Sequence, residues 1–420
     1  MKDANGYLTR RDWLAVSGLA AGALSATRAQ AAPQAPAAAV AIAKVRSYDE
    51  DLVAQFRTMF EQVGGIGGQV QGRTIAIKVN LTGANRFEGY TAGETHWVHP
   101  KVVGAVTAVL GQLGAKRIRI LESAGGRRPD ARLEDKLLQG GWDVAALKNA
   151  APLVEFEDTD GPGSGKQYST FKVPGKPYIF PAFELNRSYE DCDFFVSLGK
   201  AKNHEEMGVT MSIKNMFGVT PTALYGGRER IFHYGQVQAP SGAPAEIDPR
   251  SNRYEGWRLP RILVDIVASR PIDLAINDAI ISTVGGEGPW VLGARPIKPG
   301  FLVVGRNCVN TDAVTMATMG YNPRAGRHEA PYRLYKGPEN HPKEQLAPAD
   351  ETFQYADNMM LLAEAVGIGS ADLGKIDVRG VPIRDAVFDF EAFWKNQMPK
   401  PKVTGANRMP PADRHAAISE

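Results

Sequence analysis

A run of β-branched and apolar residues, Thr74-Ile75-Ala76-Ile77-Lys78-Val79, ends at the polar residue Asn80 and predicts a buried strand. We expect a helix next, opened by His99-Pro100. Apolar residues recur every three or four positions between Lys101 and Leu113, and Gly114 closes the run. The segment 117–121 is again strand-like. A strand, a helix and a second strand form a βαβ unit, whose crossover should be right-handed.

The same alternation continues along the chain. We expect a short helix or turn at 211–217, helices at 258–269 and 311–319, and strands at 193–198, 273–276 and 301–304. The sequence therefore predicts an α/β fold, with a mostly parallel sheet and helices on both of its faces. Long loop excursions rich in Gly, Pro and polar residues are expected at 158–167, 235–256 and 336–350. Ligands of such a sheet bind beyond the carboxyl ends of its strands.

The composition excludes several classes of protein. Hydrophobic residues make up 43% of the chain and charged residues 23%, as in ordinary soluble globular proteins. Lys and Arg number 49 against 46 Asp and Glu, so no nucleic-acid partner is expected. The two cysteines, Cys192 and Cys308, are too few for a Cys-ligated iron–sulfur cluster or a scaffold with several disulfides. Their spacing leaves open whether they form one disulfide or stay as buried thiols.

The N-terminus has the layout of an export signal. Arg10-Arg11 and Trp13-Leu14 precede an uncharged run of small and apolar residues at 15–26 and an Ala-x-Ala cleavage site at 29–31. The paired arginines resemble a twin-arginine signal. This resemblance implies a bacterial, periplasmic or otherwise extracytoplasmic protein that the twin-arginine export machinery carries in folded form. A plain secretory signal or a short core helix is the alternative. The apolar run is too short to be a stable membrane anchor.

Four segments follow from these patterns. We expect a signal peptide at 1–31, an Ala/Pro-rich linker with a first helix at 32–72, an α/β domain of one or two lobes at 73–397, and a polar tail at 398–420. The tail contains prolines and few large apolar residues, which predicts either disorder or an arm laid over a surface.

Cationic residues gather after the predicted strand at 193–198. Lys200, Lys202 and His204 come first, Lys214-Asn215 follows, and Arg228, Arg230 and His233 lie shortly downstream. At the carboxyl edge of a sheet, such side chains could hold a carboxylate or a phosphate through charge and hydrogen bonds. We therefore expect an anionic small molecule as the partner. A solvated basic loop is the alternative, because exposed lysine is common.

Acidic residues and glycines follow other predicted strands. A carboxylate beside a lysine or histidine can act as a general base, orient an imidazole or bind a hard cation, and the candidates are Glu122, Asp278, Glu287 and Asp312. Gly286 and Gly288 would let a ligand approach the backbone, or would serve only a tight turn. The candidate metal ligands are His96, His99 and Glu122, although His99 could equally cap the helix that starts at Pro100.

The order of these motifs resembles the family called domain of unknown function 362. The counterparts of its pattern are Ile77-Lys78-Val79-Asn80, Val98-His99-Pro100, 200–204, 214–218, Asp278, 285–289, Thr311-Asp312-Ala313 and Met319-Gly320. Two positions depart from the pattern: Val79 replaces a proline, and Gly285 stands where the family often has Glu. Some members carry clustered cysteines, which this chain lacks. The resemblance marks these residues as a possible site and implies no particular reaction.

The sequence favours an exported enzyme that binds an anionic small molecule or cofactor. We expect catalytic roles for Lys200, Lys202, His204, Lys214, Asp278 and Asp312, and ligand binding by Lys78, Asn80, Asn215, Arg228, Arg230, His233, Gly286 and Gly288. Oxidoreductase chemistry is favoured over hydrolysis, because the twin-arginine route often carries cofactor-loaded proteins. One alternative is a non-catalytic periplasmic binding protein for an anionic solute, and another is a structural protein. The substrate, cofactor, metal and oligomeric state stay open.

Overall fold

The computed structural model describes residues 39–83, 85–123, 132–164, 167–225, 243–334 and 355–397, with 394–397 described by backbone only. The expected signal peptide, the polar tail and the loop excursion at 336–350 lie outside the described residues. Arg228, Arg230 and His233 do so as well.

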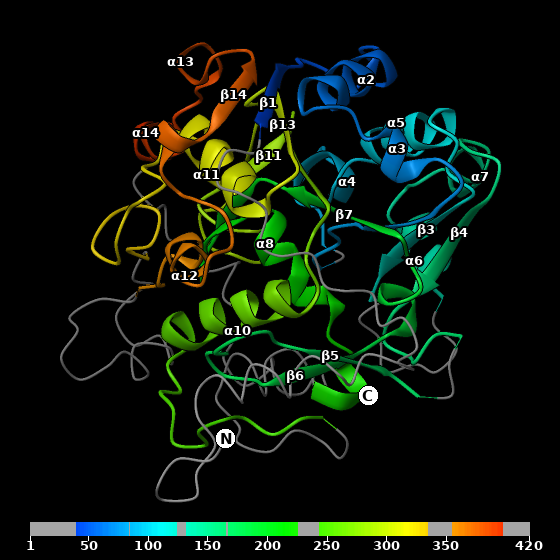
Figure 1. Ribbon diagram of the computed structural model, residues 1–420. Helices are drawn as coiled ribbons and strands as arrows, with labels where there is room; N and C mark the ends of the chain where they lie inside the picture. Colours follow the sequence, from blue (N-terminus) through cyan, green and yellow to red (C-terminus); the bar gives the residue numbers. More distant parts are fainter. Residues whose placement is uncertain are drawn as a thin grey trace, which may run out of the picture. The chain divides into compact units, whose positions relative to one another are not determined.

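An eight-stranded sheet runs through the described residues (Figure 1). In order across the sheet, its strands are β14 (Asp377–Gly380), β1 (Ala39–Lys44), β13 (Phe301–Gly305), β10 (Leu274–Ala279), β7 (Phe194–Lys200), β2 (Thr74–Lys78), β3 (Arg117–Glu122) and β4 (Val154–Asp158). β13 is antiparallel to both of its neighbours, and every other adjacent pair is parallel. The predicted α/β fold with a mostly parallel sheet is confirmed.

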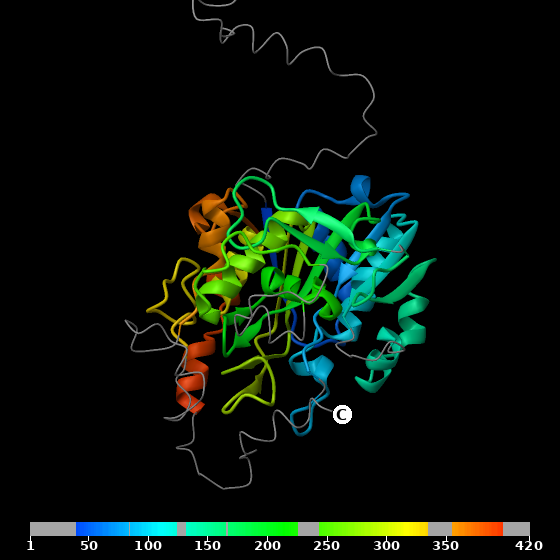
Figure 2. The same ribbon diagram turned by 90° about the horizontal axis from the view of Figure 1, so that it is seen from below.

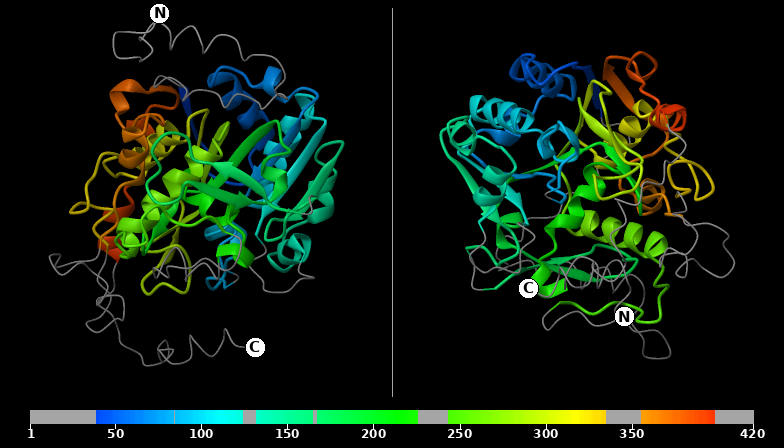
Figure 3. Two further views of the ribbon diagram at one scale, coloured as in Figure 1. Left: turned by 60° about the horizontal axis from the view of Figure 1, so that its bottom comes forward. Right: turned by 180° about the vertical axis from the view of Figure 1, so that it is seen from behind.

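Helices cover both faces of the sheet. Side chains alternate between the two faces along each strand, so each strand contributes apolar residues to two cores. Ile75 and Ile77 of β2 belong to the core packed against α2 (Leu52–Gln62), α5 (Pro100–Gln112), α6 (Leu133–Gln139) and α7 (Val144–Lys148). Ala76 belongs to the opposite core, with α10 (Glu255–Ser269), α11 (Cys308–Thr318) and α12 (Met359–Ala365). Figures 2 and 3 show the blue and cyan helices and the yellow to orange helices on opposite sides of the strands.

The helix predicted after His99-Pro100 is α5, and its sequence explains both of its ends. His99 is the N-cap residue, and its Nδ1 accepts a hydrogen bond from the Lys101 backbone N–H. Pro100 occupies the first turn, where its missing N–H costs nothing. Gly114 follows the helix with a φ of 83°, a conformation that favours glycine. The capping role considered for His99 is therefore confirmed.

The segment 39–44, which the sequence placed in the Ala/Pro-rich linker, forms strand β1 inside the sheet. Val40, Ala41 and Ile42 are fully or almost fully buried, and β1 pairs with β13 on one side and β14 on the other. The pattern was missed because small alanines alternate with only two large apolar residues, which gives little hydrophobic periodicity. The strand is specified mainly by the neighbours that its backbone pairs with.

Short elements surround this core. Three pairs of strands lie outside the main sheet: β5 (Ser169–Lys172) with β6 (Ala182–Leu185), β8 (Lys202–His204) with β9 (Gly208–Thr210), and β11 (Ser282–Val284) with β12 (Arg295–Ile297). The short helices are α3 (Gly67–Val70), α4 (Ala92–Thr95), α8 (Ser212–Asn215), α9 (Thr222–Tyr225), α13 (Ile383–Ala386), α14 (Phe390–Gln397), and the 3-10 turns η1 (Arg187–Tyr189), η2 (Met216–Val219) and η5 (Leu373–Lys375). β8 and β11 directly follow the carboxyl ends of β7 and β10, so they shape the edge where the sequence placed the site.

Two further findings bear on the sequence predictions. Cys192 and Cys308 are both free and buried, so the thiols do not pair in this structure. In the described part of the chain, no helix has the length and apolar character needed to cross a membrane.

Candidate functional site

Three of the predicted lysines lie buried at the carboxyl edge of the sheet. Lys78 ends β2, Lys200 ends β7, and Lys202 begins β8. Their exposed fractions are 1%, 0% and 0%. A buried ammonium group is costly unless a counter-charge or hydrogen bonds compensate it. The partners of each lysine therefore indicate what it does.

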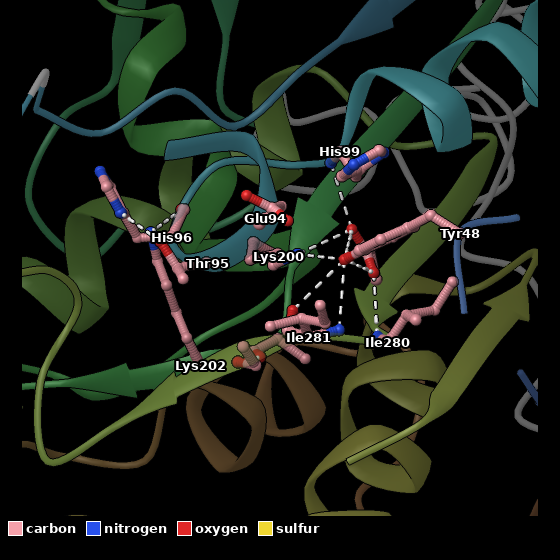
Figure 4. A network of polar contacts seen from close by, with 12 residues as sticks. Tyr48, Glu94, Thr95, His96, His99, Lys200, Lys202, Ile280 and Ile281 are labelled. Atoms are coloured by element: carbon pink, nitrogen blue, oxygen red, sulfur yellow. Dashed lines mark hydrogen bonds and ion pairs between the residues drawn. The ribbon is translucent and has the colours of Figure 1, made fainter. Parts of the chain in front are cut away.

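Lys200 belongs to a closed network with Asp278 and Tyr48. Figure 4 labels Lys200 and Tyr48 of this network. Its Nζ donates to Asp278 Oδ2 at 2.9 Å and to Tyr48 Oη at 2.8 Å. The Tyr48 hydroxyl lies 3.1 and 3.2 Å from the two Asp278 carboxylate oxygens. The backbone N–H groups of His99 and Ile280 also donate to Asp278, at 3.2 and 3.0 Å. We call Tyr48, Lys200 and Asp278 the paired-lysine network, because the charge of its one lysine is paired with the carboxylate of Asp278.

Burial decides the protonation states around this network. Burial and the charge of Asp278 raise the pKa of Tyr48 well above its usual range, so its hydroxyl keeps its proton. Burial lowers the pKa of Lys200, while the charge of Asp278 opposes that shift. The His99 ring stacks on Tyr48 with centroids 3.6 Å apart, and burial lowers the pKa of His99 to about 4. His99 is therefore a neutral imidazole at neutral pH.

Lys78 forms a second closed pair, with Glu122 of β3. Its Nζ lies 2.7 Å from Glu122 Oε1 and donates to the Val79 carbonyl at 2.8 Å. The Glu122 oxygens also accept from the backbone N–H groups of Leu81 and Ser123. Asn215 joins this pair, because its Nδ2 donates to the Lys78 carbonyl at 3.0 Å. Glu122 is thus engaged in a buried ion pair, and the described residues hold no cluster of three or more metal-ligating side chains.

Gly218 lies against this ion pair and leads to a prediction. A Cβ at residue 218 would come within 2.7 Å of Glu122 Oε1 and 2.8 Å of Lys78 Nζ. Gly218→Ala is therefore expected to displace the pair and to lower the unfolding temperature clearly. Gly68→Ala is the control, since a Cβ there meets nothing within 4 Å and Gly68 lies in a helix. Thermal unfolding followed by circular dichroism measures both, and equal midpoints would contradict the close packing at Gly218.

Lys202 differs from the other two lysines, because no carboxylate contacts it. Its Nζ donates to the His96 carbonyl at 2.5 Å and to Thr82 Oγ1 at 3.2 Å, and Figure 4 shows the side chain running toward His96. Among the residues that the structure describes, no ion pair includes Lys202. Burial lowers the pKa of its ammonium group to about 7; Lys200 and Lys214 act in the same direction, and Glu287 opposes them.

Other polar atoms near Lys202 also lack partners. Thr210 stands directly opposite Lys202 in the β8–β9 pair, and its Oγ1 is buried without a hydrogen bond. His96, whose carbonyl accepts from Lys202, has a buried Nε2 atom with no hydrogen-bond partner. Its Nδ1 lies 3.0 Å from Thr95 Oγ1, and burial lowers its pKa to about 3. Buried polar atoms without partners are rare in native proteins, and two of those in the described residues lie beside Lys202.

Glu287 and Trp290 form one wall beside His96. Glu287 Oε1 accepts from the Trp290 indole N–H at 2.9 Å, and its Oε2 accepts from the Glu205 backbone N–H at 3.0 Å. The Trp290 ring lies 5.4 Å from the His96 ring, edge to face. Gly286 and Gly288 make room for this loop, because a Cβ at either position would meet Val291 or Trp290 within 2.5 Å. The close approaches at these glycines are thus to side chains of their own loop.

His204 lies next to this wall. Its Nδ1 accepts a hydrogen bond from the Glu206 backbone N–H at 3.1 Å and is 3.7 Å from Glu287 Oε2. Burial lowers the pKa of His204 to about 3, so its imidazole is neutral at neutral pH.

Asp312 lies on the other face of the sheet from Asp278. Its carboxylate accepts from the backbone N–H groups of Ser212 and Ile213, at 3.0 and 2.9 Å, and from the Asn277 side chain at 2.9 Å. Asn277 and Asp278 are neighbours on β10, so their side chains point to opposite faces. Asp312 therefore holds the start of α8 in place. Burial raises its pKa to about 6.

The structure thus divides the predicted site residues into groups. Lys200 and Asp278 form one network, and Lys78, Asn80, Asn215 and Glu122 form another. Lys202 and His96 lie together, and His204 lies beside Glu287. Lys214 lies 4.6 Å from the centre of the Phe217 ring. Sequence patterns did not indicate Tyr48, because it follows strand β1, which was not predicted. They also did not single out Thr82, Thr210 or Trp290 as site residues.

Comparison with known proteins places these residues in a family. A family model, described as domain of unknown function 362, matches residues 75–317. A thylakoid-associated protein of Synechocystis sp. is 27% identical over 317 residues, which cover 73% of this chain and 84% of that protein. A crystal structure of a Thermotoga maritima protein matches with a TM-score of 0.33 and 12% identity, over 57% of this chain and 52% of that one. Since the family model spans more than half of the sequence, this chain belongs to the domain of unknown function 362 family.

Proposed function

We propose that this protein is an enzyme that binds an anionic small molecule at the carboxyl edge of its sheet, with Lys202 at the centre of the site. One observation carries the proposal: Lys202 is a fully buried lysine that contacts no carboxylate of the described residues. A buried ammonium that has hydrogen bonds but no counter-charge still costs several kcal/mol of desolvation free energy. A bound anion would supply the missing counter-charge.

The neighbouring lysines support this assignment by contrast. Lys78 and Lys200 lie in the same layer and are equally buried, yet each has a carboxylate oxygen within 3 Å. Neither has a charge left over for a ligand. The hydrogen bonds of Lys202 to the described residues go to neutral oxygen atoms, and the positive charge of Lys214 adds to its own. An anion is therefore favoured at Lys202 over the other two positions.

The proposal of an enzyme rests on three side chains whose pKa values burial has lowered: Lys202, His96 and His204. The pKa of Lys202 lies near 7, where proton transfer by a side chain is most effective. His96 and His204 are neutral imidazoles in the same region and could accept or relay a hydrogen bond to a ligand. Perturbed ionisable groups that gather at one sheet edge are typical of active sites.

The anion site predicts a specific loss on substitution. Isothermal titration calorimetry of the full chain with oxalate and with inorganic phosphate should detect binding. Lys202→Met should weaken it about 30-fold, because a charged hydrogen bond worth roughly 2 kcal/mol is lost. Lys172→Met is the matched control, since Lys172 is exposed on β5. Equal affinities for the two variants would contradict a site at Lys202.

Export and cofactor use belong to the same proposal. The paired arginines support transport of the folded protein out of the cytoplasm, which suits a chain loaded with a cofactor and favours oxidoreductase chemistry. Metal analysis and an absorption spectrum of the protein purified from its native host test the cofactor. Processing at the Ala29-Gln30-Ala31 site tests the signal.

A non-catalytic binding protein is the second candidate, and one observation favours it. Tyr48, Lys200 and Asp278 satisfy one another, so no member of that network is left to act on a ligand. Prolonged incubation with a bound ligand distinguishes the two functions, because a binding protein returns the ligand unchanged.

A further inference from the structure

We propose that Lys202 is a nucleophile that forms an imine with a 2-oxo acid. This inference rests on the proposed function, since it assigns a substrate class to the anion site. A 2-oxo acid carries a carboxylate beside a carbonyl carbon, so it combines the anion that the region attracts with an atom that an amine attacks.

The choice of lysine comes from the geometry of the three buried amines. An amine must be unprotonated to attack a carbonyl, and a carboxylate at ion-pair distance keeps it protonated. Asp278 lies 2.9 Å from Lys200 Nζ, and Glu122 lies 2.7 Å from Lys78 Nζ. Within the described residues, the hydrogen bonds of Lys202 Nζ go to two neutral acceptors, the His96 carbonyl and the Thr82 hydroxyl. Desolvation and neighbouring positive charge are the means by which proteins activate a lysine.

Residues around Lys202 also suit the carboxylate and the carbonyl oxygen of a 2-oxo acid. Lys214 is close enough to act on Lys202 through its charge, so it would attract the substrate carboxylate when Lys202 itself is neutral. Thr210 stands opposite Lys202 with a hydroxyl that has no partner, so it can hydrogen-bond the oxygen of the addition product. Directly opposite side chains in an antiparallel pair lie about 5 Å apart at Cβ, which is within reach of a small adduct.

The amine of Lys202 lies next to residues that are partly exposed at the surface. Thr82, whose hydroxyl contacts Lys202 Nζ, is partly exposed, and its neighbour Gly83 is exposed. Trp290 is also partly exposed, and it packs so closely over Gly83 that a Cβ there would lie 2.5 Å from its ring. Because Lys202 itself is fully buried, the proposed imine requires Thr82 and Trp290 to move aside when the substrate enters.

The chemical step balances without an added oxidant or reductant. The neutral amine of Lys202 forms a C–N bond to the keto carbon, and the carbonyl oxygen takes up a proton to give a carbinolamine. Loss of this oxygen as water, with the two hydrogens that the amine gives up, leaves the C=N bond of the imine. The carboxylate is unchanged throughout.

Borohydride trapping tests the imine on the full-length protein. Incubation with pyruvate and sodium borohydride should add one carboxyethyl group, and peptide mass spectrometry should locate it at Lys202. The yield should rise as the pH passes about 7, because the amine must be neutral. Oxalate, which has no keto group, should compete with pyruvate and reduce trapping.

Three variants separate the outcomes. Lys202→Met should lose the adduct and bind oxalate about 30-fold more weakly. Lys202→Arg should lose the adduct and keep oxalate binding, because the charge remains. Lys172→Met should behave like the wild type. Trapping on surface lysines alone, or no trapping while oxalate still requires Lys202, would overturn the imine and leave the anion site standing. Absence of both adduct and Lys202-dependent binding would overturn the two proposals together.

Discussion

Asp278→Ala is expected to lower the free energy of unfolding by about 3–5 kcal/mol, the cost of leaving one member of a buried ion pair without its partner. Asp278 and Lys200 are both fully buried, and their contact is 2.9 Å. The substitution also removes the acceptor for Tyr48 and for the backbone N–H groups of His99 and Ile280. Chemical denaturation monitored by circular dichroism measures the change.

A surface ion pair in the same chain serves as the control for this prediction. Lys101 and Asp49 form such a pair, and 80% of the Asp49 side chain is exposed. Asp49→Ala removes a carboxylate from a lysine just as Asp278→Ala does, but water replaces the lost partner. Its unfolding midpoint should stay near that of the wild type. If both variants unfolded alike, the paired-lysine network would contribute nothing to stability.

The second large effect concerns pH and Lys202. In the folded protein the pKa of Lys202 is about 7, whereas an unfolded lysine titrates near 10.4. Between these values the unfolded chain binds a proton that the folded chain does not, so the free energy of unfolding should rise with pH. The rise attributable to this group should total about 5 kcal/mol across the window and be absent below pH 7.

The difference between the wild type and Lys202→Met isolates this contribution, since other groups titrate in both proteins. The variant replaces a buried amine by an apolar chain of similar length, so it should be the more stable protein near neutral pH. Its advantage should shrink as the pH rises from about 7 toward about 10.4, because removing the proton of the wild-type lysine on folding then costs less free energy. A constant difference over the whole range would mean that Lys202 keeps its proton when folded, and the imine would lose its support.

Local patterns were enough to predict the elements that carry the sheet. β2, α5 and β3 appear where the hydrophobic periodicity and the signals at Pro100 and Gly114 placed them. β7 and β10 were also expected, with boundaries within a few residues. These elements bury long periodic runs of Val, Ile and Leu, so their own side chains specify them. β1 was not predicted, because its alanines carry little periodicity and its place depends on pairing with β13 and β14.

The candidate site also divides into features that local sequence predicts and features that depend on tertiary contacts. The sequence alone determined that lysines and carboxylates follow the strands of a parallel sheet, and this placed them at one edge. It could not determine which of them meet, because Lys78, Lys200 and Lys202 are chemically the same residue. Only the tertiary structure decided that Glu122 and Asp278 neutralise two of these lysines and leave the third without a counter-charge. The physical reason is that an ion pair depends on separations of a few ångströms between residues far apart in the chain, whereas a strand or helix depends on its own neighbours.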